Sequence, residues 1–408
     1  MNSLRRLLLF SFLFVFTLEA KEKPYVLLIS FDGFRADYLD WYNTPNFDRL
    51  AEHGVKADGM KPVFVSKTFP NHYSLATGMF IENHGLIGNH FYDKKLGEYF
   101  TLSDRSKVED ARFYGGEPIW VTAEKQGVKT ASYFWAGSEA PVGGVWSSIW
   151  KKYDHDFPFL ARVDSVAKWF TLPEEKRPHL IMLYFHEPDD AGHRYGPKSA
   201  ETEAMVDSMD TIMGMIISSM ESLDIYPHLN IIVVADHGMA AISPERTIDL
   251  SDYVKLSGIK QEGSGPFAML YGEDNQKLNT IVKKLKSVPH MSVYKKEEIP
   301  DRYHFKNHYR IKDVLLVADE GWFILDKKYF GADKFNLKFL HGGTHGYDNE
   351  LRSMHAIFLA DGPAFKDGYS RPTLENIHIY PLIAEILGLT PNDKIDGSLE
   401  KVRDLLKD

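Results

Sequence analysis

Three almost continuous apolar segments constrain most strongly what this chain can fold into. They are Tyr25–Phe31 (YVLLISF), Leu180–Phe185 (LIMLYF) and Asn230–Ala235 (NIIVVA). Each has the length of a strand, and none alternates apolar with polar residues, which is typical of strands covered on both faces. Helical patterns lie between them, and strands that alternate with helices form parallel sheets. We therefore predict an α/β fold with a mostly parallel central sheet flanked by helices.

Three segments carry the spacing and end signals of helices. The first opens at Pro45 after Thr44 and closes before Gly54, the second covers Glu201–Leu223, and the third covers Ile379–Leu387. In the second, large apolar residues recur every three or four positions: Met205, Met209, Met213, Ile217 and Met220. A methionine series can bind copper, but this spacing is typical of a helix face packed in a core.

The alternation of strand and helix breaks between residues 255 and 335. This stretch is rich in Lys, His and Tyr, and it shows no buried-strand pattern before Trp322–Leu325. We predict a small inserted α+β subdomain at 255–335, within a main domain formed by 21–254 and 336–408. The chain then returns to the main core with a predicted strand at Met354–Leu359.

Residues 1–20 have the build of a secretory signal peptide. Arg5 and Arg6 precede the apolar run Leu7–Leu18, and Ala20 offers a small residue for cleavage. The run is about twelve residues long, short of the roughly 20 that a membrane-spanning helix needs. We expect an exported, periplasmic or secreted protein with no stable membrane span after cleavage. The alternatives are an uncleaved anchor and a buried N-terminal helix.

Composition limits the chemistry that the chain can perform. None of the 408 residues is cysteine, and 17 are histidine. This excludes disulfides, thiolate metal sites, iron–sulfur clusters and a cysteine nucleophile. A bound metal must therefore use His, Asp and Glu, and such ligands favour zinc over manganese or iron. The formal net charge of −9 argues against a nucleic-acid polymer as partner, because such binding needs a basic face.

Metal-type ligands follow all three apolar segments. Asp32 comes directly after the first, Asp189 and His193 come shortly after the second, and Asp236 and His237 come shortly after the third. In open α/β sheets, ligands bind beyond the carboxyl ends of the strands. A single aspartate there commonly only caps a turn. Three of them, two with a histidine nearby, predict a metal site.

Two further features bear on this predicted site. Asp189 and His193 are four residues apart, so a helical turn places both side chains on one face. The glycine-rich segment 341–349 (HGGTHGYDN) adds His341 and His345 as candidate ligands, and spacing alone does not choose between them.

A hydroxyl lies near the start of a predicted helix in the segment 66–78 (SKTFPNHYSLATG). Thr68 precedes Pro70, a residue suited to the first helical turn, and the helical pattern continues from Asn71. The amino-terminal end of a helix favours anions. Thr68 is therefore either a simple N-cap or, beside a bound metal, a nucleophile with a lowered hydroxyl pKa.

Six segments resemble motifs of the nucleotide pyrophosphatase/phosphodiesterase family, in the family's order. They are SFDGFRADYL, KTFPNHYSLATG, HGLIGNHFYD, EPDDAGHRYGP, VVADHGM and THGYDN, and they lie between residues 30 and 349. The resemblance implies the alkaline phosphatase-like fold of that superfamily and two zinc ions per chain. One zinc ion would be bound by Asp189, His193 and His345. The other would be bound by Asp32, Asp236, His237 and Thr68.

The resemblance also implies which residues hold the substrate. Asn89 would donate to a non-bridging phosphoryl oxygen, and Phe69 would stack on a base with Tyr153 as its partner. His341 would stay outside the ligand set. Where the family usually has Phe-Trp-Pro-Gly-Ser, this chain has Ala136 in place of the proline. That departure leaves the leaving-group preference open.

These roles predict a zinc-dependent hydrolase of nucleotide phosphodiester or pyrophosphate bonds. Thr68 would form a covalent phospho-threonine intermediate, and the product would be a nucleoside monophosphate. An uncharged aromatic slot implies little base specificity. The alternatives are a phosphate monoesterase of the same superfamily, a choline or lipid phosphodiesterase and, least favoured, a protein that only binds zinc or nucleotides. A monoesterase usually adds a basic clamp, for which Lys67 is the only cation in its stretch.

Overall fold

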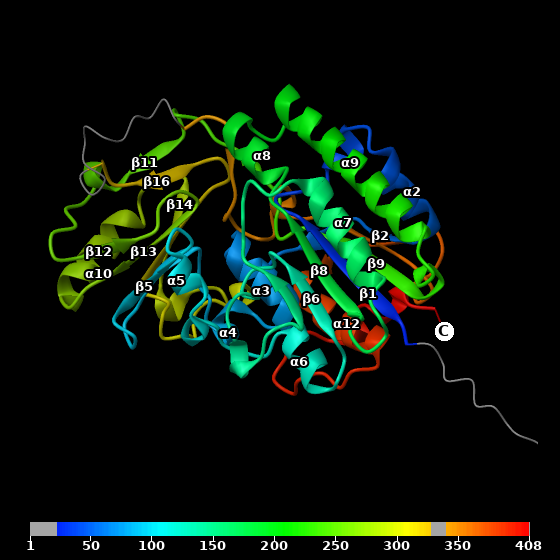
Figure 1. Ribbon diagram of the computed structural model, residues 1–408. Coiled ribbons are helices and arrows are strands. Elements are labelled where there is room, and N and C mark those ends of the chain that lie inside the picture. Colours follow the sequence, from blue (N-terminus) through cyan, green and yellow to red (C-terminus); the bar gives the residue numbers. More distant parts are fainter. Residues whose placement is uncertain (1–22, 328–339, 408) are drawn as a thin grey trace, which may run out of the picture.

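The computed structural model describes residues 23–327 and 340–407, so the predicted signal peptide at 1–20 lies outside the described residues. An eight-stranded sheet forms the centre of the molecule (Figure 1). Its strands are β1 Tyr25–Phe31, β2 Val55–Ala57, β6 Thr130–Tyr133, β7 Ile149–Lys151, β8 Leu180–Phe185, β9 Leu229–Val234, β18 Phe358–Asp361 and β19 Tyr369–Arg371.

The strand order in this sheet is β19-β2-β18-β9-β1-β8-β6-β7. β1 runs parallel to both of its neighbours, with Ser30 opposite Tyr184 of β8 and Val234 of β9. β6 is parallel to β7 and β8, and β19 is parallel to β2, whereas β18 is antiparallel to β2 and β9. The predicted mostly parallel sheet is confirmed, and its three central strands are the three apolar segments.

Helices cover both faces of the sheet, which makes a three-layer α/β/α arrangement (Figure 1). On one face α2 (Pro45–His53), α7 (Phe159–Phe170) and α9 (Ala200–Glu221) pack together, and on the other α3 (Thr68–Thr77), α6 (Ile119–Lys125) and α12 (Ile379–Leu387) do so. The methionine series of α9 packs in the core, where Met209, Met213 and Met220 are buried.

Shorter elements surround these layers. The remaining α-helices among the described residues are α1 Tyr38–Trp41, α4 Ile81–His84, α5 Arg105–Val108, α8 Asp189–Tyr195 and α10 Asn275–Leu285. Four two-stranded pairs are β3 Met60–Lys61 with β20 Leu374–Glu375, β4 His90–Asp93 with β5 Glu98–Thr101, β10 Ala240–Ala241 with β17 Gly343–Thr344, and β11 Thr247–Asp249 with β16 Phe323–Leu325. No helix in the described parts of the chain has both the length and the apolar character needed to cross a membrane.

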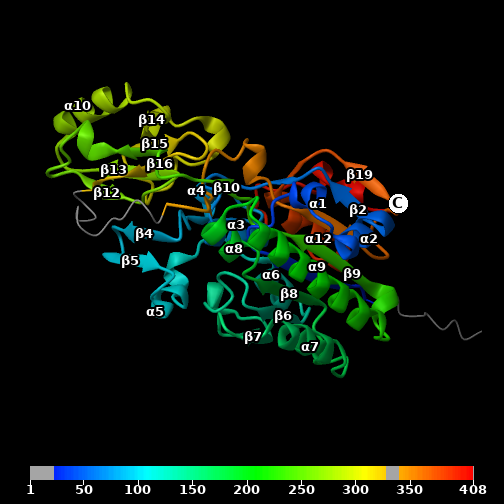
Figure 2. The ribbon, with the colours of Figure 1, turned by 90° about the horizontal axis from the view of Figure 1, so that it is seen from above.

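A second sheet lies at the end of the molecule away from the C-terminus, where α10 accompanies it (Figure 2). It is antiparallel, in the order β12 (Lys260–Glu262), β13 (Phe267–Tyr271), β15 (Val314–Ala318), β14 (Met291–Lys295). This sheet falls in the predicted insertion, whose boundaries at 255 and 335 stay a prediction.

The expectation that no buried strand precedes Trp322–Leu325 in this stretch was wrong. All five residues of β15 are buried. Leu315 and Val317 pack into the main core, whereas Val314, Leu316 and Ala318 pack into a second apolar cluster on the other side of the strand. The strand is therefore covered on both faces although it belongs to a small antiparallel sheet.

The predicted strand at Met354–Leu359 was wrong in its first half. Arg352–Met354 forms a short 3-10 turn, and β18 begins only at Phe358. The residues between them are bonded elsewhere: Ala356 exchanges two backbone hydrogen bonds with Met60, at 2.7 and 2.8 Å. These bonds hold the segment outside the sheet ladder.

Candidate active site at the carboxyl ends of the central strands

Three buried aspartates gather at one edge of the central sheet. β1 and β9 are parallel and in register, so Asp32, which follows β1, comes level with Asp236, which follows β9. β8 lies on the other side of β1, and α8 begins at Asp189 shortly after this strand ends. All three side chains are buried. The topology therefore brings together ligands that lie more than 200 residues apart.

The turn at Gly33 allows this close approach. Its φ of +66° is in the left-handed region, which favours glycine. Its N–H donates to Asp236 Oδ1 at 3.1 Å, and a Cβ at this position would lie 2.7 Å from Asp189 Oδ1. A side chain here would therefore push the carboxylates apart.

The first group of potential ligands consists of Asp32, Asp236 and His237. His237 Nε2 lies 2.8 Å from Asp236 Oδ2 and 3.6 Å from Asp32 Oδ1. The hydroxyl of Tyr184 donates to the other oxygen of Asp32, Oδ2, at 2.6 Å. These three ligand atoms are close enough to share one ion.

The second group consists of Asp189, His193 and His345. Asp189 and His193 lie four residues apart in α8, and His193 Nε2 is 3.3 Å from Asp189 Oδ2. His345 Nε2 lies 3.1 Å from His193 Nε2 and 3.9 Å from Asp189 Oδ1. His341 is exposed and belongs to neither group.

The three histidines are oriented in the same way. Each Nδ1 lies within hydrogen-bond distance of a backbone carbonyl oxygen: His237 with Gly238 at 2.9 Å, His193 with Gly343 at 2.9 Å, and His345 with Ser66 at 2.7 Å. Because a carbonyl only accepts, Nδ1 must carry the proton, which leaves the Nε2 lone pair free. A backbone acceptor behind the ring is the usual support of a histidine that binds metal.

Each of the three aspartates has one buried carboxylate oxygen without a hydrogen-bond partner: Asp32 Oδ1, Asp189 Oδ1 and Asp236 Oδ2. Buried polar atoms are normally bonded, so three such oxygens at one place require an explanation. Burial and the neighbouring carboxylates of Asp236 and Asp189 also raise the pKa of Asp32 well above its usual value. Divalent cations would satisfy these oxygens and offset the repulsion. The donor set, oxygen and imidazole without sulfur, fits zinc.

Thr68 stands beside the first group. It is the first residue of α3, whereas the N-cap is Lys67, so its hydroxyl does not serve as the helix cap. Thr68 Oγ1 lies 3.4 Å from His237 Nε2. The structure thus places a hydroxyl at a helix N-terminus, next to a group of potential metal ligands.

Comparison with known proteins decides the family. Residues 26–348 match the family described as type I phosphodiesterase / nucleotide pyrophosphatase. The chain belongs to this family. It is 40% identical over 397 residues to the venom phosphodiesterase of Naja atra, covering 93% of this chain and 46% of that protein. It is 37% identical over 388 residues to bis(5′-adenosyl)-triphosphatase enpp4 of Xenopus laevis, covering 94% and 82%. The chain therefore spans about half the length of the venom phosphodiesterase that it matches.

Solved structures of the family show the same fold. The human ectonucleotide pyrophosphatase / phosphodiesterase 5 is 36% identical and superimposes with a TM-score of 0.87, covering 94% of this chain and all of that chain. The murine protein is 35% identical with the same TM-score, and one of its structures is an inactive threonine-to-alanine variant in complex with AMP. These matches confirm the predicted alkaline phosphatase-like α/β fold.

Two of the three substrate residues implied by the family resemblance, Phe69 and Tyr153, line one cavity. This cavity, of about 300 Å³, is lined by Phe69 and Tyr153 together with Thr68, Asp32 and Asp189. Phe134 and Ala136 also line it, so the stretch that departs from the usual family sequence forms part of its wall. The predicted aromatic residues therefore face the same space as Thr68 and two of the potential metal ligands, Asp32 and Asp189.

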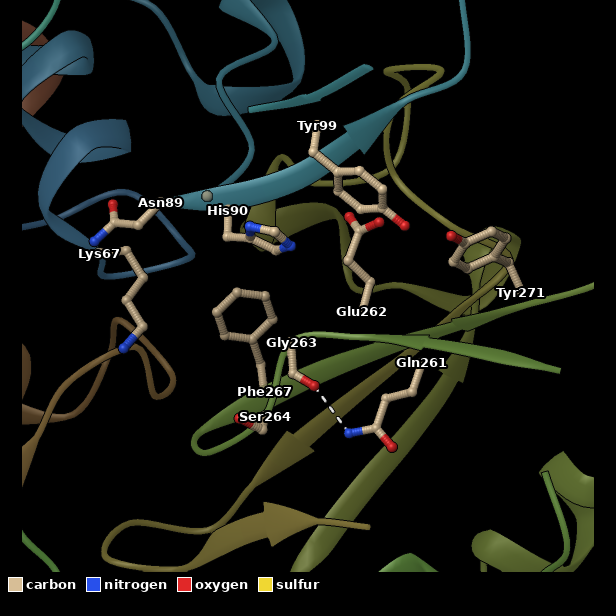
Figure 3. A pocket seen from close by; sticks show the side chains of 11 residues that line it. Lys67, Asn89, His90, Tyr99, Gln261, Glu262, Gly263, Ser264, Phe267 and Tyr271 are labelled. Atoms are coloured by element: carbon tan, nitrogen blue, oxygen red, sulfur yellow. Dashed lines mark hydrogen bonds between the residues drawn. The ribbon is translucent and has the colours of Figure 1, made fainter. Parts of the chain in front are cut away.

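Asn89 lines a neighbouring cavity and is hydrogen-bonded to Phe69, which lines this one. Its Oδ1 accepts a hydrogen bond from the backbone N–H of Phe69 at 3.0 Å, which leaves the amide NH₂ available as a donor. Asn89 and Lys67 lie at one end of a second cavity of about 370 Å³, whose other end is formed by residues of the second sheet such as Gln261 and Tyr271 (Figure 3).

Two residues of the site escaped the sequence reasoning. Tyr184 bonds Asp32, and His72 lies behind Asp236, with Nδ1 3.6 Å from Asp236 Oδ2 and 3.0 Å from the carbonyl oxygen of Thr68. For Tyr184 the only sequence signal is a polar ring near the end of an apolar strand, which is weak. For His72 the signal is stronger, because it lies four residues after Thr68 in a predicted helix and therefore on the same face as Thr68.

Proposed function

We propose that this chain is a zinc-dependent phosphodiesterase/pyrophosphatase. It hydrolyses phosphodiester or pyrophosphate bonds of nucleotides to a nucleoside monophosphate, through a covalent phospho-threonine intermediate. The observation that carries this proposal is the convergence of three buried carboxylates and three histidine Nε2 atoms beside the hydroxyl of Thr68. The names of the relatives, venom phosphodiesterase and bis(5′-adenosyl)-triphosphatase, support the substrate class.

The two ligand groups suit two zinc ions. Asp189, His193 and His345 would hold one ion, and Asp32, Asp236, His237 and Thr68 would hold the other. When bound, zinc lowers the pKa of a hydroxyl that it contacts and stabilises the attacking and leaving oxygens of a displacement.

Thr68 performs the covalent step. Its Oγ1 loses its proton to solvent and forms a bond to phosphorus, while the bond from phosphorus to the leaving oxygen breaks and its electron pair departs with that oxygen. Water then attacks the same phosphorus, the bond to Oγ1 breaks, and a proton returns to Thr68. The nucleoside monophosphate leaves with the oxygen that water supplied.

Three other residues position the substrate. Asn89 donates from its free amide to a non-bridging phosphoryl oxygen, a role commonly worth about 2.7–4 kcal/mol in the transition state. Phe69 and Tyr153 offer ring faces to the base from the cavity that they share with Thr68. Because ring faces do not read base edges, we expect little base specificity.

The site takes a small nucleotide rather than a nucleic-acid polymer, and the chain acts after export. The signal-like segment at residues 1–20 and the similarity to venom enzymes support export.

The proposal is tested with two chromogenic esters and one dinucleotide. We expect faster hydrolysis of bis-p-nitrophenyl phosphate than of p-nitrophenyl phosphate. A chelator should abolish the hydrolysis of both esters, and added zinc should restore it. Diadenosine triphosphate should yield AMP. Preference for the monoester would instead favour a phosphatase, and turnover that survives chelation would contradict the zinc proposal. Zinc binding without hydrolysis of any ester would leave only a binding function.

A further inference from the structure

A third set of potential metal ligands lies at the rim of the cavity that holds Phe69 and Tyr153. It consists of His155, His186 and Asp190, each of which offers one ligand atom within 4.8 Å of the others. None of the three belongs to the two ligand groups described above. They are half-buried or exposed, whereas those groups are largely enclosed.

The fold brings these residues together from three segments. His186 follows β8 directly, Asp190 is the second residue of α8, and His155 lies in the connection between β7 and α7. His155 Nε2 is 3.3 Å from Asp190 Oδ2, and the His155 and His186 rings stack with their centroids 4.0 Å apart. Two imidazoles and a carboxylate are thus held side by side.

Each histidine has a nitrogen available for an ion. His155 Nδ1 lies 3.0 Å from the hydroxyl of Tyr153, which leaves Nε2 directed at Asp190. His186 Nδ1 is buried and has no hydrogen-bond partner, and its ring packs against Phe159 with centroids 5.0 Å apart. An unsatisfied buried nitrogen is costly unless a ligand completes it.

The protonation state of His186 is also the one that metal binding requires. Burial, together with the nearby Arg162 guanidinium, lowers the pKa of His186 to about 3. The ring is therefore neutral at pH 7, the form in which imidazole binds a metal.

We propose that His155, His186 and Asp190 form a third divalent-metal site, separate from the two groups beside Thr68, that binds zinc or a similar transition ion. Two nitrogens and one carboxylate oxygen are a usual zinc ligand set, in which the fourth position stays open. His155 Nε2 and Asp190 Oδ2 already lie 3.3 Å apart, close to the ~3.4 Å between ligand atoms of a tetrahedral site with bonds of about 2.1 Å, whereas the stacked rings of His155 and His186 must turn before both direct a nitrogen at one ion. All three residues line the cavity, so an ion bound by them would border it.

The test is the number of zinc ions bound per chain in the full protein. Wild type and His155→Ala are dialysed against a zinc buffer, and bound metal is measured by mass spectrometry. We expect His155→Ala to bind one zinc ion fewer than wild type. When both proteins are loaded with Co²⁺ instead, the visible absorption of the bound cobalt should be weaker in His155→Ala than in wild type. His155 is half-exposed, so its truncation leaves the core intact.

His290→Ala is the matched control. His290 Nδ1 also lies 3.3 Å from a carboxylate oxygen, of Asp319, and its ring also stacks on an aromatic neighbour, Trp322 at 3.9 Å. Among the described residues it belongs to no group of three ligands, so its replacement should leave the count unchanged. Equal zinc content in wild type and His155→Ala, or an equal loss in both variants, would overturn the third site. Because the test is a difference, it does not depend on the two ions proposed beside Thr68.

Discussion

The two ligand groups beside Thr68 differ in how the fold builds them. Asp32, Asp236 and His237 follow two adjacent parallel strands in the middle of the sheet, and all three are almost completely buried. The other group combines a helix, α8, with the segment around His345, and the side chain of His193 is 38% exposed. The first group is therefore fixed by the sheet, whereas the second is assembled from separate segments and reaches solvent.

This difference suggests different tasks. The enclosed group lies next to Thr68, so it is suited to holding the nucleophile in place. The more open group is suited to the side of the reaction where water enters and the leaving group departs. The following variants test this division, from the largest expected effect to the smallest.

Thr68→Ala should remove turnover almost entirely while leaving metal bound. Loss of a nucleophile commonly costs roughly 10⁴-fold or more in kcat. The six aspartate and histidine ligands remain, so metal content should change little. Hydrolysis of bis-p-nitrophenyl phosphate and metal analysis measure the two quantities. Thr77→Ala, at the other end of α3, is the control, since its hydroxyl only donates to the Tyr73 carbonyl at 2.7 Å. Normal activity of Thr68→Ala would rule out the nucleophile assignment.

Asn89→Ala should reduce kcat without changing metal content. Asn89 belongs to neither ligand group, and loss of one donor to a developing negative charge costs about 10²–10³-fold in kcat. Steady-state kinetics with the diester, alongside metal analysis, separate the two effects. A variant that loses metal together with activity would show that Asn89 supports the ligands rather than the phosphoryl oxygen.

His193→Ala should weaken the binding of one zinc ion and leave the other ion bound. Because His193 belongs to the more open group, its truncation should lower the affinity for one zinc ion by at least about 10²-fold. In wild type, the ion of this group should also leave first during dialysis against a chelator, giving two phases of metal loss. His237→Ala should instead affect the slow phase. A single phase in wild type would contradict the difference between the two groups.

Asp32→Asn should stabilise the metal-free protein. Without cations, buried carboxylates repel one another, and removing one charge relieves that repulsion. The asparagine oxygen can still accept from Tyr184. Urea unfolding in a chelator should therefore show a higher midpoint for Asp32→Asn than for wild type, and the order should reverse with zinc. Asp189→Asn should give a smaller gain, because its group is closer to solvent.

Parts of the fold could be read from the sequence because they have local causes. β1 and β8 have the bounds of the predicted segments, and β9 differs by one residue at each end. Their apolar character on both faces reports burial directly. α2 and α12 also have their predicted bounds, since Pro45, Gly54 and Gly388 mark helix ends. β18 was misjudged because its partners decide where it begins, whereas β15 was overlooked although its own sequence, VLLVA, has the continuous apolar pattern of a strand covered on both faces.

For the candidate active site, too, some features could be predicted from the sequence and others depend on the packing of distant segments. The sequence by itself determined that Asp32, Asp189 and Asp236 follow buried strands and that Thr68 opens a helix, because these positions depend on neighbouring residues. It also left His341 and His345 equivalent until a family resemblance favoured His345. Only the tertiary structure brought His345 Nε2 to within 3.1 Å of His193 Nε2 across 152 residues and joined Tyr184 to Asp32. Only it gathered His155, His186 and Asp190. Local patterns record which face of an element is buried, but the convergence of distant side chains is decided by how the elements pack.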